Sequence, residues 1–172
     1  MHNIQIHIKT LLCMAIGVII STQILSAQEQ LTVEKATLAS GISLQLKGNE
    51  IPDDLSTLVL FDSAGAGFAL RSVTLDGQKI WLRKSDTPSS VPNTVTWFFD
   101  PGSRVLSIDL QGIKSRISQS SVLQVKVNPT LENHQKLKIS IDQATQYPVN
   151  GNPTGAPIKE IVVELINTKN TD

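Results

Sequence analysis

Apolar and polar residues alternate along most of the chain after residue 30, which is typical of β-strands with one buried face. The segment Ile42-Ser-Leu-Gln-Leu-Lys47 is the cleanest case, because every second residue is apolar. By contrast, Thr57-Leu-Val-Leu-Phe61 is a continuous apolar run and predicts a strand covered on both faces. The strands predicted in this way are 31–38, 42–47, 57–61, 68–75, 79–83, 94–99, 104–110, 121–127, 137–141 and 158–166.

Turn signals separate these strands at intervals typical of a β-sandwich. Asp76-Gly77 predicts a tight hairpin, since both central positions of a type I′ turn need positive φ. Asp100-Pro-Gly-Ser103 favours a type II turn, so the strands around it either pair through a wider loop or lie in different sheets. The chain is therefore expected to be all-β, an immunoglobulin-like or jelly-roll sandwich of about nine to ten short strands.

The first residues have the pattern of a secretory signal peptide. Lys9 precedes the apolar run 11–20, and Ala27 is a small residue at a suitable cleavage position. The run is shorter than the ~18 apolar residues of a membrane span. We expect cleavage after Ala27, leaving 28–172 as one domain with no membrane span. The single cysteine, Cys13, is removed with the signal, so the domain has no disulfide.

Charge and histidine content exclude several functions. The chain carries 15 basic and 15 acidic side chains, and removal of Lys9 leaves 14 against 15, a net charge of −1. Without a basic block, nucleic-acid and anionic-membrane binding lose their main driving force. His134 is the only histidine after position 27, in a polar loop, so neither a Ser-His-acid triad nor a zinc site is expected. The protein is predicted not to be an enzyme.

The aromatic residues suggest a ligand-binding surface. Trp97 shares a strand face with Val95 and Phe99 and is expected in the core. Trp81 instead shares its face with Lys79 and Arg83, which predicts an exposed ring suited to stacking on a sugar. Cation–π contacts from either basic residue would support the ring. Tyr147, in the Pro- and Gly-rich segment 144–157, is a further candidate for this surface.

Four aspartates are the candidate metal ligands. Calcium prefers several hard oxygen ligands, often from loops. Asp53, Asp54, Asp62 and Asp100 all fall in predicted loops or at strand ends, without the regular spacing of a calcium loop. The alternative is that these residues form turns, as Asp commonly does. No cofactor is required, and calcium is the metal that remains open.

The C-terminal half resembles bacterial cohesin-like and carbohydrate-binding-module-like sandwiches. The similarity runs over about 105–166 and rests on the segments 105–112, 117–127, 137–144 and Gly151-Asn-Pro153. It implies a jelly-roll-like domain that binds an extracellular protein or polysaccharide without catalysis.

Segments 31–38 and 158–166 are predicted edge strands, at which a partner strand can add. The leading hypothesis is a secreted, periplasmic or cell-surface binding or assembly domain for a protein partner. The alternative is a carbohydrate-binding module that uses Trp81 as its platform.

Overall fold

A computed structural model describes residues 32–37, 40–130, 136–153 and 157–166. They belong to the unit Leu31–Asp172, which separates from Met1–Gln30. The predicted signal peptide, 1–27, and the loop residue His134 lie outside the described residues. None of the helical segments within the described ranges is long and apolar enough to span a membrane.

The all-β prediction is confirmed: the described residues form eleven strands and two short 3-10 helices, η1 (Gly48–Glu50) and η2 (Lys114–Arg116). The sequence pattern predicts ten strands, and the additional one arises because segment 79–83 is divided between two sheets. The strands are β1 (Thr32–Thr37), β2 (Ile42–Lys47), β3 (Thr57–Asp62), β4 (Phe68–Leu75), β5 (Gln78–Lys79), β6 (Trp81–Lys84), β7 (Thr94–Asp100), β8 (Val105–Asp109), β9 (Val122–Pro129), β10 (Lys136–Ala144) and β11 (Pro157–Ile166).

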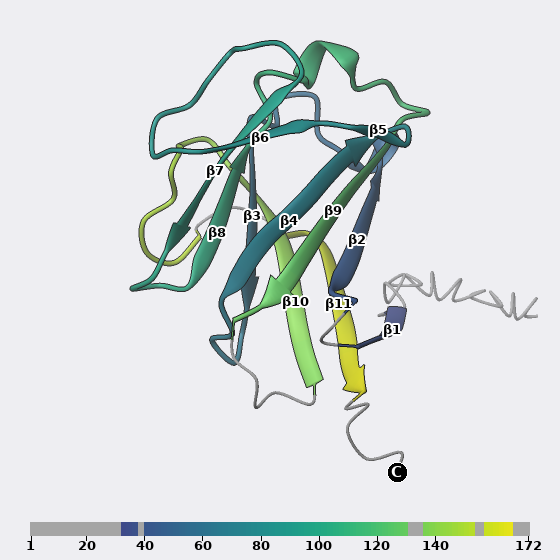
Figure 1. The fold of residues 1–172 in the computed structure, drawn as a ribbon, viewed down its shortest axis with the longest axis vertical. Coiled ribbons are helices and arrows are strands. Elements are labelled where there is room, and N and C mark those ends of the chain that lie inside the picture. Colours follow the sequence, from purple (N-terminus) through teal and green to yellow (C-terminus); the bar gives the residue numbers. More distant parts are fainter. Residues whose placement is uncertain (1–31, 38–39, 131–135, 154–156, 167–172) are drawn as a thin grey trace, which may run out of the picture. The chain divides into compact units, whose positions relative to one another are not determined.

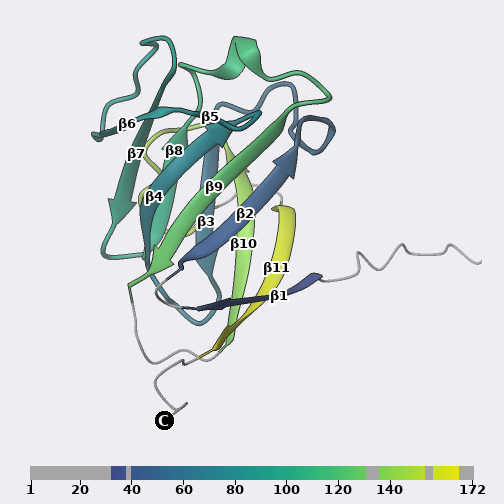
Figure 2. The same cartoon turned by 45° about the vertical axis from the view of Figure 1, so that its right-hand side comes forward.

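The strands form a seven-stranded sheet, β1-β11-β10-β3-β8-β7-β6, and a four-stranded sheet, β2-β9-β4-β5 (Figures 1 and 2). The neighbours β2-β9-β4 and β11-β10-β3 follow the B-E-D and G-F-C orders of the immunoglobulin fold. The hairpin of β7 and β8 extends the larger sheet beyond β3, and β1 pairs with β11 in parallel. The sequence left immunoglobulin-like and jelly-roll sandwiches open, and the strand order is that of an immunoglobulin-like sandwich.

One prediction about the edges is wrong. Strand β1 does lie at the end of the larger sheet, but β11 pairs on both sides, with β1 and with β10. The N-terminal strand covers the last one, so 158–166 is an interior strand. The true ends of the two sheets are β1, β6, β2 and β5.

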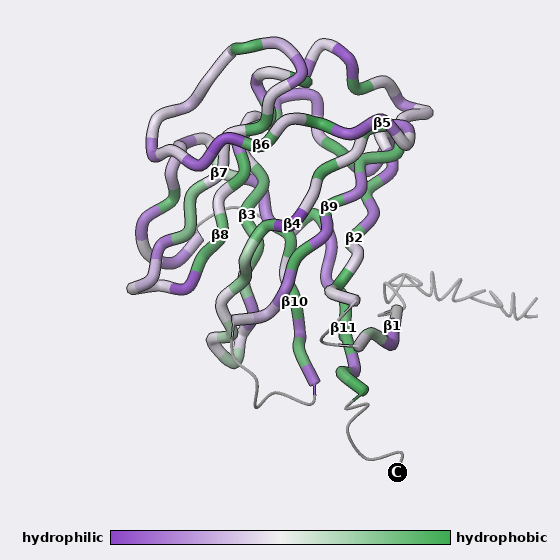
Figure 3. Tube along the Cα trace, viewed as in Figure 1, coloured by the Kyte–Doolittle hydropathy of each residue, from purple (hydrophilic) through white to green (hydrophobic). Residues whose placement is uncertain are grey.

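The alternating positions of both sheets meet in one hydrophobic core, and Figure 3 shows the alternation along the strands. Phe68 of β4 is fully buried there, as are Leu44 of β2 and Ile108 of β8. Trp97 and Phe99 are partly buried and pack against the same core. The core position predicted for Trp97 is therefore confirmed only in part, since Trp97 lies at the margin of the core.

Both turn predictions have clear outcomes. Asp76 and Gly77 have φ values of 51° and 77°, which confirms the tight hairpin between β4 and β5. After Asp100-Pro-Gly-Ser103, β7 and β8 pair antiparallel, with Asp100 opposite Val105. The strands therefore pair through a four-residue loop and do not lie in different sheets, but the predicted type II turn is wrong, because the positive φ of 59° falls on Arg104 and not on Gly102.

The outer face of the larger sheet is covered in part by the segment 145–153. Val149 of this segment packs on Val59 and Val105 in a second, smaller hydrophobic cluster, with Phe61 at its margin. Strand β3 is consequently buried on both faces over Thr57–Leu60. The double coverage predicted from its continuous apolar run is confirmed.

Candidate functional site at the edge around Trp81

The candidate site is a basic edge that we call the Trp81 surface, made of Lys79, Trp81, Arg83 and Lys84. Trp81 is 73% exposed, and Lys79, Arg83 and Lys84 are exposed as well. Figure 3 shows β6 as a hydrophilic stretch at the end of the larger sheet. Three of the four predicted ligand-binding residues therefore lie on one ribbon of chain.

The ribbon changes sheets between two consecutive residues. The N–H of Ile80 donates to the carbonyl of Val73 on β4, at 2.9 Å, which keeps the chain in the smaller sheet. The N–H of Trp81 donates to the carbonyl of Asn93, at 3.0 Å, just before β7 of the larger sheet. Ile80 is buried, so it anchors the crossing, while alternation turns the Trp81 side chain outward. The single return strand predicted over 79–83 is thus two strands, β5 and β6.

The loop that follows β6 returns the chain to the start of β7 and is held at several points. The N–H of Asn93 donates to the carbonyl of Gly112, at 2.9 Å. A Cβ on Gly112 would lie 2.2 Å from the carbonyl oxygen of Thr94 and 2.4 Å from that of Val91, so only glycine fits there. Arg116 donates to the side chains of Asn93 and Gln78. These contacts hold the start of β7, the strand with which β6 pairs.

Asp109 of β8 is a further anchor of this loop and is itself buried. Its carboxylate accepts hydrogen bonds from the N–H groups of Ser89, at 3.2 Å, and Gln111, at 3.3 Å. Burial raises the pKa of Asp109 above its ordinary range, and the two N–H donors offset part of that rise. Sequence alone gives no sign of this role, because Asp109 occupies an ordinary polar position of an alternating strand.

Tyr147 comes close to the end of β6 but is not a free platform. Its side chain is half-buried, and its hydroxyl donates to the carbonyl of Ser85, the residue directly after β6. Burial raises the pKa of Tyr147, and the charges of Asp109 and Asp86 add to the rise. Tyr147 therefore ties the segment 145–153 to the Trp81 surface.

Lys84 belongs to this surface, although the sequence pattern does not indicate it. Its Nζ lies 5.5 Å from the centre of the Trp97 ring, a cation–π distance. Neither Lys84, Lys79 nor Arg83 forms an ion pair within the described parts of the chain. The result is an edge with an exposed aromatic ring and three cations, Arg83 on the face of Trp81 and Lys84 on the opposite face with Trp97, and the described residues contain no ion-pair partner for them.

The four candidate calcium ligands are not brought together. Within the described ranges there is no group of three or more His, Cys, Asp or Glu side chains able to hold a metal. Asp62 accepts backbone N–H groups from Ala64 and Ala66 through one oxygen and from Lys138 through the other. Asp53 and Asp54 are exposed in a turn, and Asp53 borders a cavity of about 250 Å³. Calcium binding stays a prediction without structural support.

Asp100 organises the turn after β7 and also holds the segment 145–153. Its carboxylate accepts from the hydroxyl and N–H of Ser103, from the N–H of Gly102 at 3.1 Å, and from the N–H of Gly151 at 3.1 Å. The Ser103 hydroxyl is the main reason that the pKa of Asp100 falls from 3.8 to about 2, followed by the Gly151 and Gly102 N–H groups.

This lowered pKa predicts a specific pH dependence. An ionised Asp100 stabilises the fold fully above its unfolded pKa of 3.8, and the contribution is lost as the pH falls through about 2. The difference in unfolding free energy between the wild type and Asp100→Ala is therefore expected to be largest above pH 3.8 and to shrink towards pH 2. Urea unfolding at several pH values measures it. A difference that stays constant over this range would contradict the assignment.

Comparisons with known proteins add little. No protein-family model matches the chain, and no curated protein is similar to it in sequence. Among solved structures, the major pilin subunit BcpA of Bacillus cereus is similar with a TM-score of 0.36 and 11% sequence identity. The match covers 77% of this chain but only 37% of that pilin, and at this level it carries no argument about function. The resemblance to cohesin-like domains stays a prediction.

Proposed function

We propose that the protein is a non-catalytic, extracytoplasmic binding domain that recognises a protein partner through the Trp81 surface. The observation that carries the proposal is the 73% exposure of Trp81 on a strand at the end of a sheet. An indole exposed to this extent contributes nothing to the core, and aromatic residues and arginine are enriched where partners bind. Export to the periplasm, the medium or the cell surface rests on the predicted signal peptide.

The firm attachment of the ribbon supports the proposal. Ile80 anchors its middle, and Gly112, Asp109 and Tyr147 hold the loop beside it. A surface held in this way needs little ordering when a partner binds, which favours affinity.

The test is peptide-display selection against residues 28–172, followed by affinity measurement on the selected peptides. Replacing Trp81 by alanine is expected to weaken their binding by about 30-fold or more, as for an aromatic residue at the centre of an interface. Val122→Ala is the matched control, because Val122 is exposed on β9 of the other sheet. Peptides that bind the Trp81→Ala variant as well as the wild type would refute the proposal.

A carbohydrate-binding module is the second candidate, favoured by the polar surroundings of the ring. Sugar rings stack on a flat, exposed aromatic face, and Trp81 has Arg83 rather than an apolar residue on the same strand face. Electrophoresis through gels containing neutral or acidic polysaccharides separates the two candidates. Retardation of the wild type but not of Trp81→Ala would support the carbohydrate module, whereas selection of Trp81-dependent peptides without retardation supports a protein partner.

A further inference from the structure

The two sheets have four ends, and each end strand is a place where a partner strand can add. Proteins protect such ends with charged side chains, short strands or covering contacts. An end strand that lacks such protection is therefore the one at which a partner strand can add. The comparison rests on the proposed function, because it asks which partner the Trp81 surface takes.

The end at β2 is blocked by side chains from other elements. The Nζ of Lys159, on β11, donates to the outward carbonyl of Gln45 at 3.2 Å. Glu50 accepts the N–H of Lys47 at 2.7 Å and pairs with Lys159 at 3.6 Å. Two backbone groups that an added strand would need are thus already bonded.

The ends at β1 and β5 are also poor acceptors. Strand β5 has two residues, too few for a stable ladder, and Arg116 bonds the side chain of Gln78. Strand β1 exposes Glu34 and Lys35, adjacent residues of opposite charge. Neither strand shows an exposed aromatic residue within its described side chains.

Strand β6 differs from the other three end strands, because its outward backbone groups are available to a partner strand. In its parallel pairing with β7, Trp81 donates to Asn93 and Ser85 donates to Trp97, at 3.0 and 3.1 Å. Alternate residues of a strand bond to opposite sides, so Arg83 also faces β7. The backbone N–H and C=O of Leu82 and Lys84 consequently point to the side on which no strand pairs.

The side-chain charges of β5 and β6 favour one kind of partner. Lys79, Arg83 and Lys84 are all positive and form no ion pair in the part of the chain described here. A second copy would bring the same cations against them, and like charges on paired strands repel. An acidic segment would instead be attracted, and an apolar residue on it would cover the Trp81 ring.

We infer that β6 accepts an extended, acidic segment of a partner protein as an added strand. Its backbone bonds to the outward groups of Leu82 and Lys84, and its carboxylates lie near Arg83 and Lys79. The basic side chains have two effects: they repel the same strand of another copy of this chain, and they attract an acidic strand.

The test uses a short, capped peptide that alternates glutamate and valine, titrated by fluorescence anisotropy against residues 28–172. The central comparison is Lys84→Pro with Lys84→Ala. Both variants lose the charge and the contact with Trp97, but only proline also removes the outward N–H, which an edge position tolerates. Proline is expected to weaken binding about fivefold more than alanine does, the effect of one hydrogen bond.

Two peptide controls test the same idea without altering the protein. A peptide with alternate amides N-methylated keeps its charge but loses the backbone donors of one side, and it is expected to bind about tenfold more weakly. A peptide with lysine in place of glutamate is expected not to bind. These arms remain decisive if Lys84→Pro fails to fold.

The outcomes separate this inference from the proposed function. Equal binding of the N-methylated and parent peptides, with binding abolished by Trp81→Ala, would overturn strand addition and leave the Trp81 surface as the binding site. Failure of the parent peptide to bind the wild type would also overturn the inference, and the display selection would then decide the proposed function alone. Binding unaffected by Trp81→Ala would count against both.

Discussion

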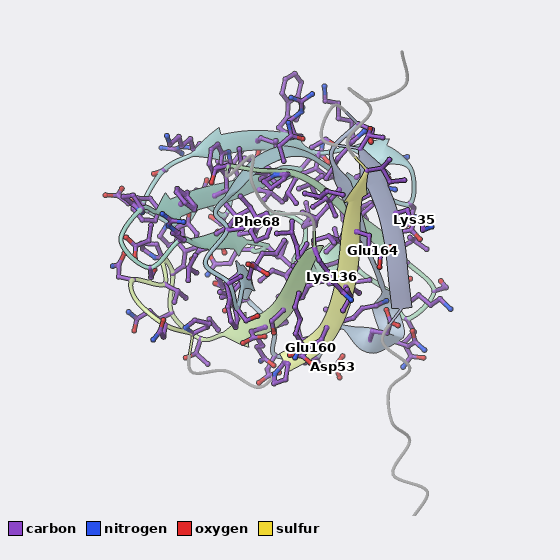
Figure 4. All side chains as sticks on the ribbon, turned by 90° about the horizontal axis from the view of Figure 1, so that it is seen from below. Lys35, Asp53, Phe68, Lys136, Glu160 and Glu164 are labelled. Carbon is purple, nitrogen blue, oxygen red and sulfur yellow. The ribbon has the colours of Figure 1, made fainter. Side chains whose placement is uncertain are left out.

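Alanine at position 68 is expected to lower the free energy of unfolding by about 3–5 kcal/mol. Phe68 is fully buried and belongs to the core that joins the two sheets, where Figure 4 shows it among the packed side chains. Truncation removes the largest fully buried side chain of this core and leaves a cavity. The two packed sheets cannot move together enough to close it.

The matched control is Trp81→Ala, which truncates an aromatic residue of similar size at the surface. Because Trp81 is exposed, its loss is expected to change stability by less than about 0.5 kcal/mol. Urea unfolding followed by circular dichroism measures both variants, since tryptophan fluorescence differs between them. Comparable losses at the two positions would place Trp81 in the core and remove the basis of the binding surface.

Asp62→Ala is expected to lower the free energy of unfolding by about 3–5 kcal/mol, although Asp62 is polar and belongs to neither hydrophobic cluster. The buried carboxylate accepts the N–H of Ala64 at 3.0 Å, Ala66 at 3.2 Å and Lys138 at 2.8 Å. Alanine would leave these donors without their acceptor, and an unsatisfied buried donor is expensive. The residue thus joins the turn after β3 to the start of β10.

Asp54→Ala provides the comparison, since Asp54 is an exposed turn residue and was an equal candidate for calcium. Its loss is expected to change stability by less than about 0.5 kcal/mol. Thermal and urea unfolding of both variants, with and without calcium, distinguish the two roles. A calcium-dependent stability that vanishes in both variants would show a shared metal site instead of a backbone anchor at Asp62.

Most strands could be predicted because their alternation reports burial directly. Segments 42–47 and 68–75 coincide with β2 and β4, and the run 57–61 even predicted coverage of β3 on both faces. What covers the outer face was not predictable, since it depends on Val149 reaching β3 and β8 from a Pro- and Gly-rich segment. The role of Asp109 likewise depends on a distant segment, the loop after β6, from which it accepts the N–H of Ser89.

The site was predicted in part. Alternation alone placed Trp81 outward with Lys79 and Arg83, because side-chain direction is a local property. The change of sheet at Ile80 was missed, since a continuous strand and a crossing strand have the same alternation and differ only in the bond to Asn93. Asp62 and Asp100 were predicted as metal ligands because the carboxylate oxygens that bind a cation are the same atoms that accept hydrogen bonds from backbone N–H groups.

Opposite charges alternate across β1, β11 and β10, where Figure 4 labels Lys35, Glu164, Lys136 and Glu160. Glu164 lies in register with both Lys35 and Lys136, and Glu160 pairs with Lys138 at 3.0 Å. The opposite charges on this face therefore largely cancel in solution, whereas the cations of the Trp81 surface produce a positive electrostatic potential. An approaching acidic molecule is oriented towards β6 before contact, so electrostatics acts on the rate of encounter more than on the lifetime of the complex.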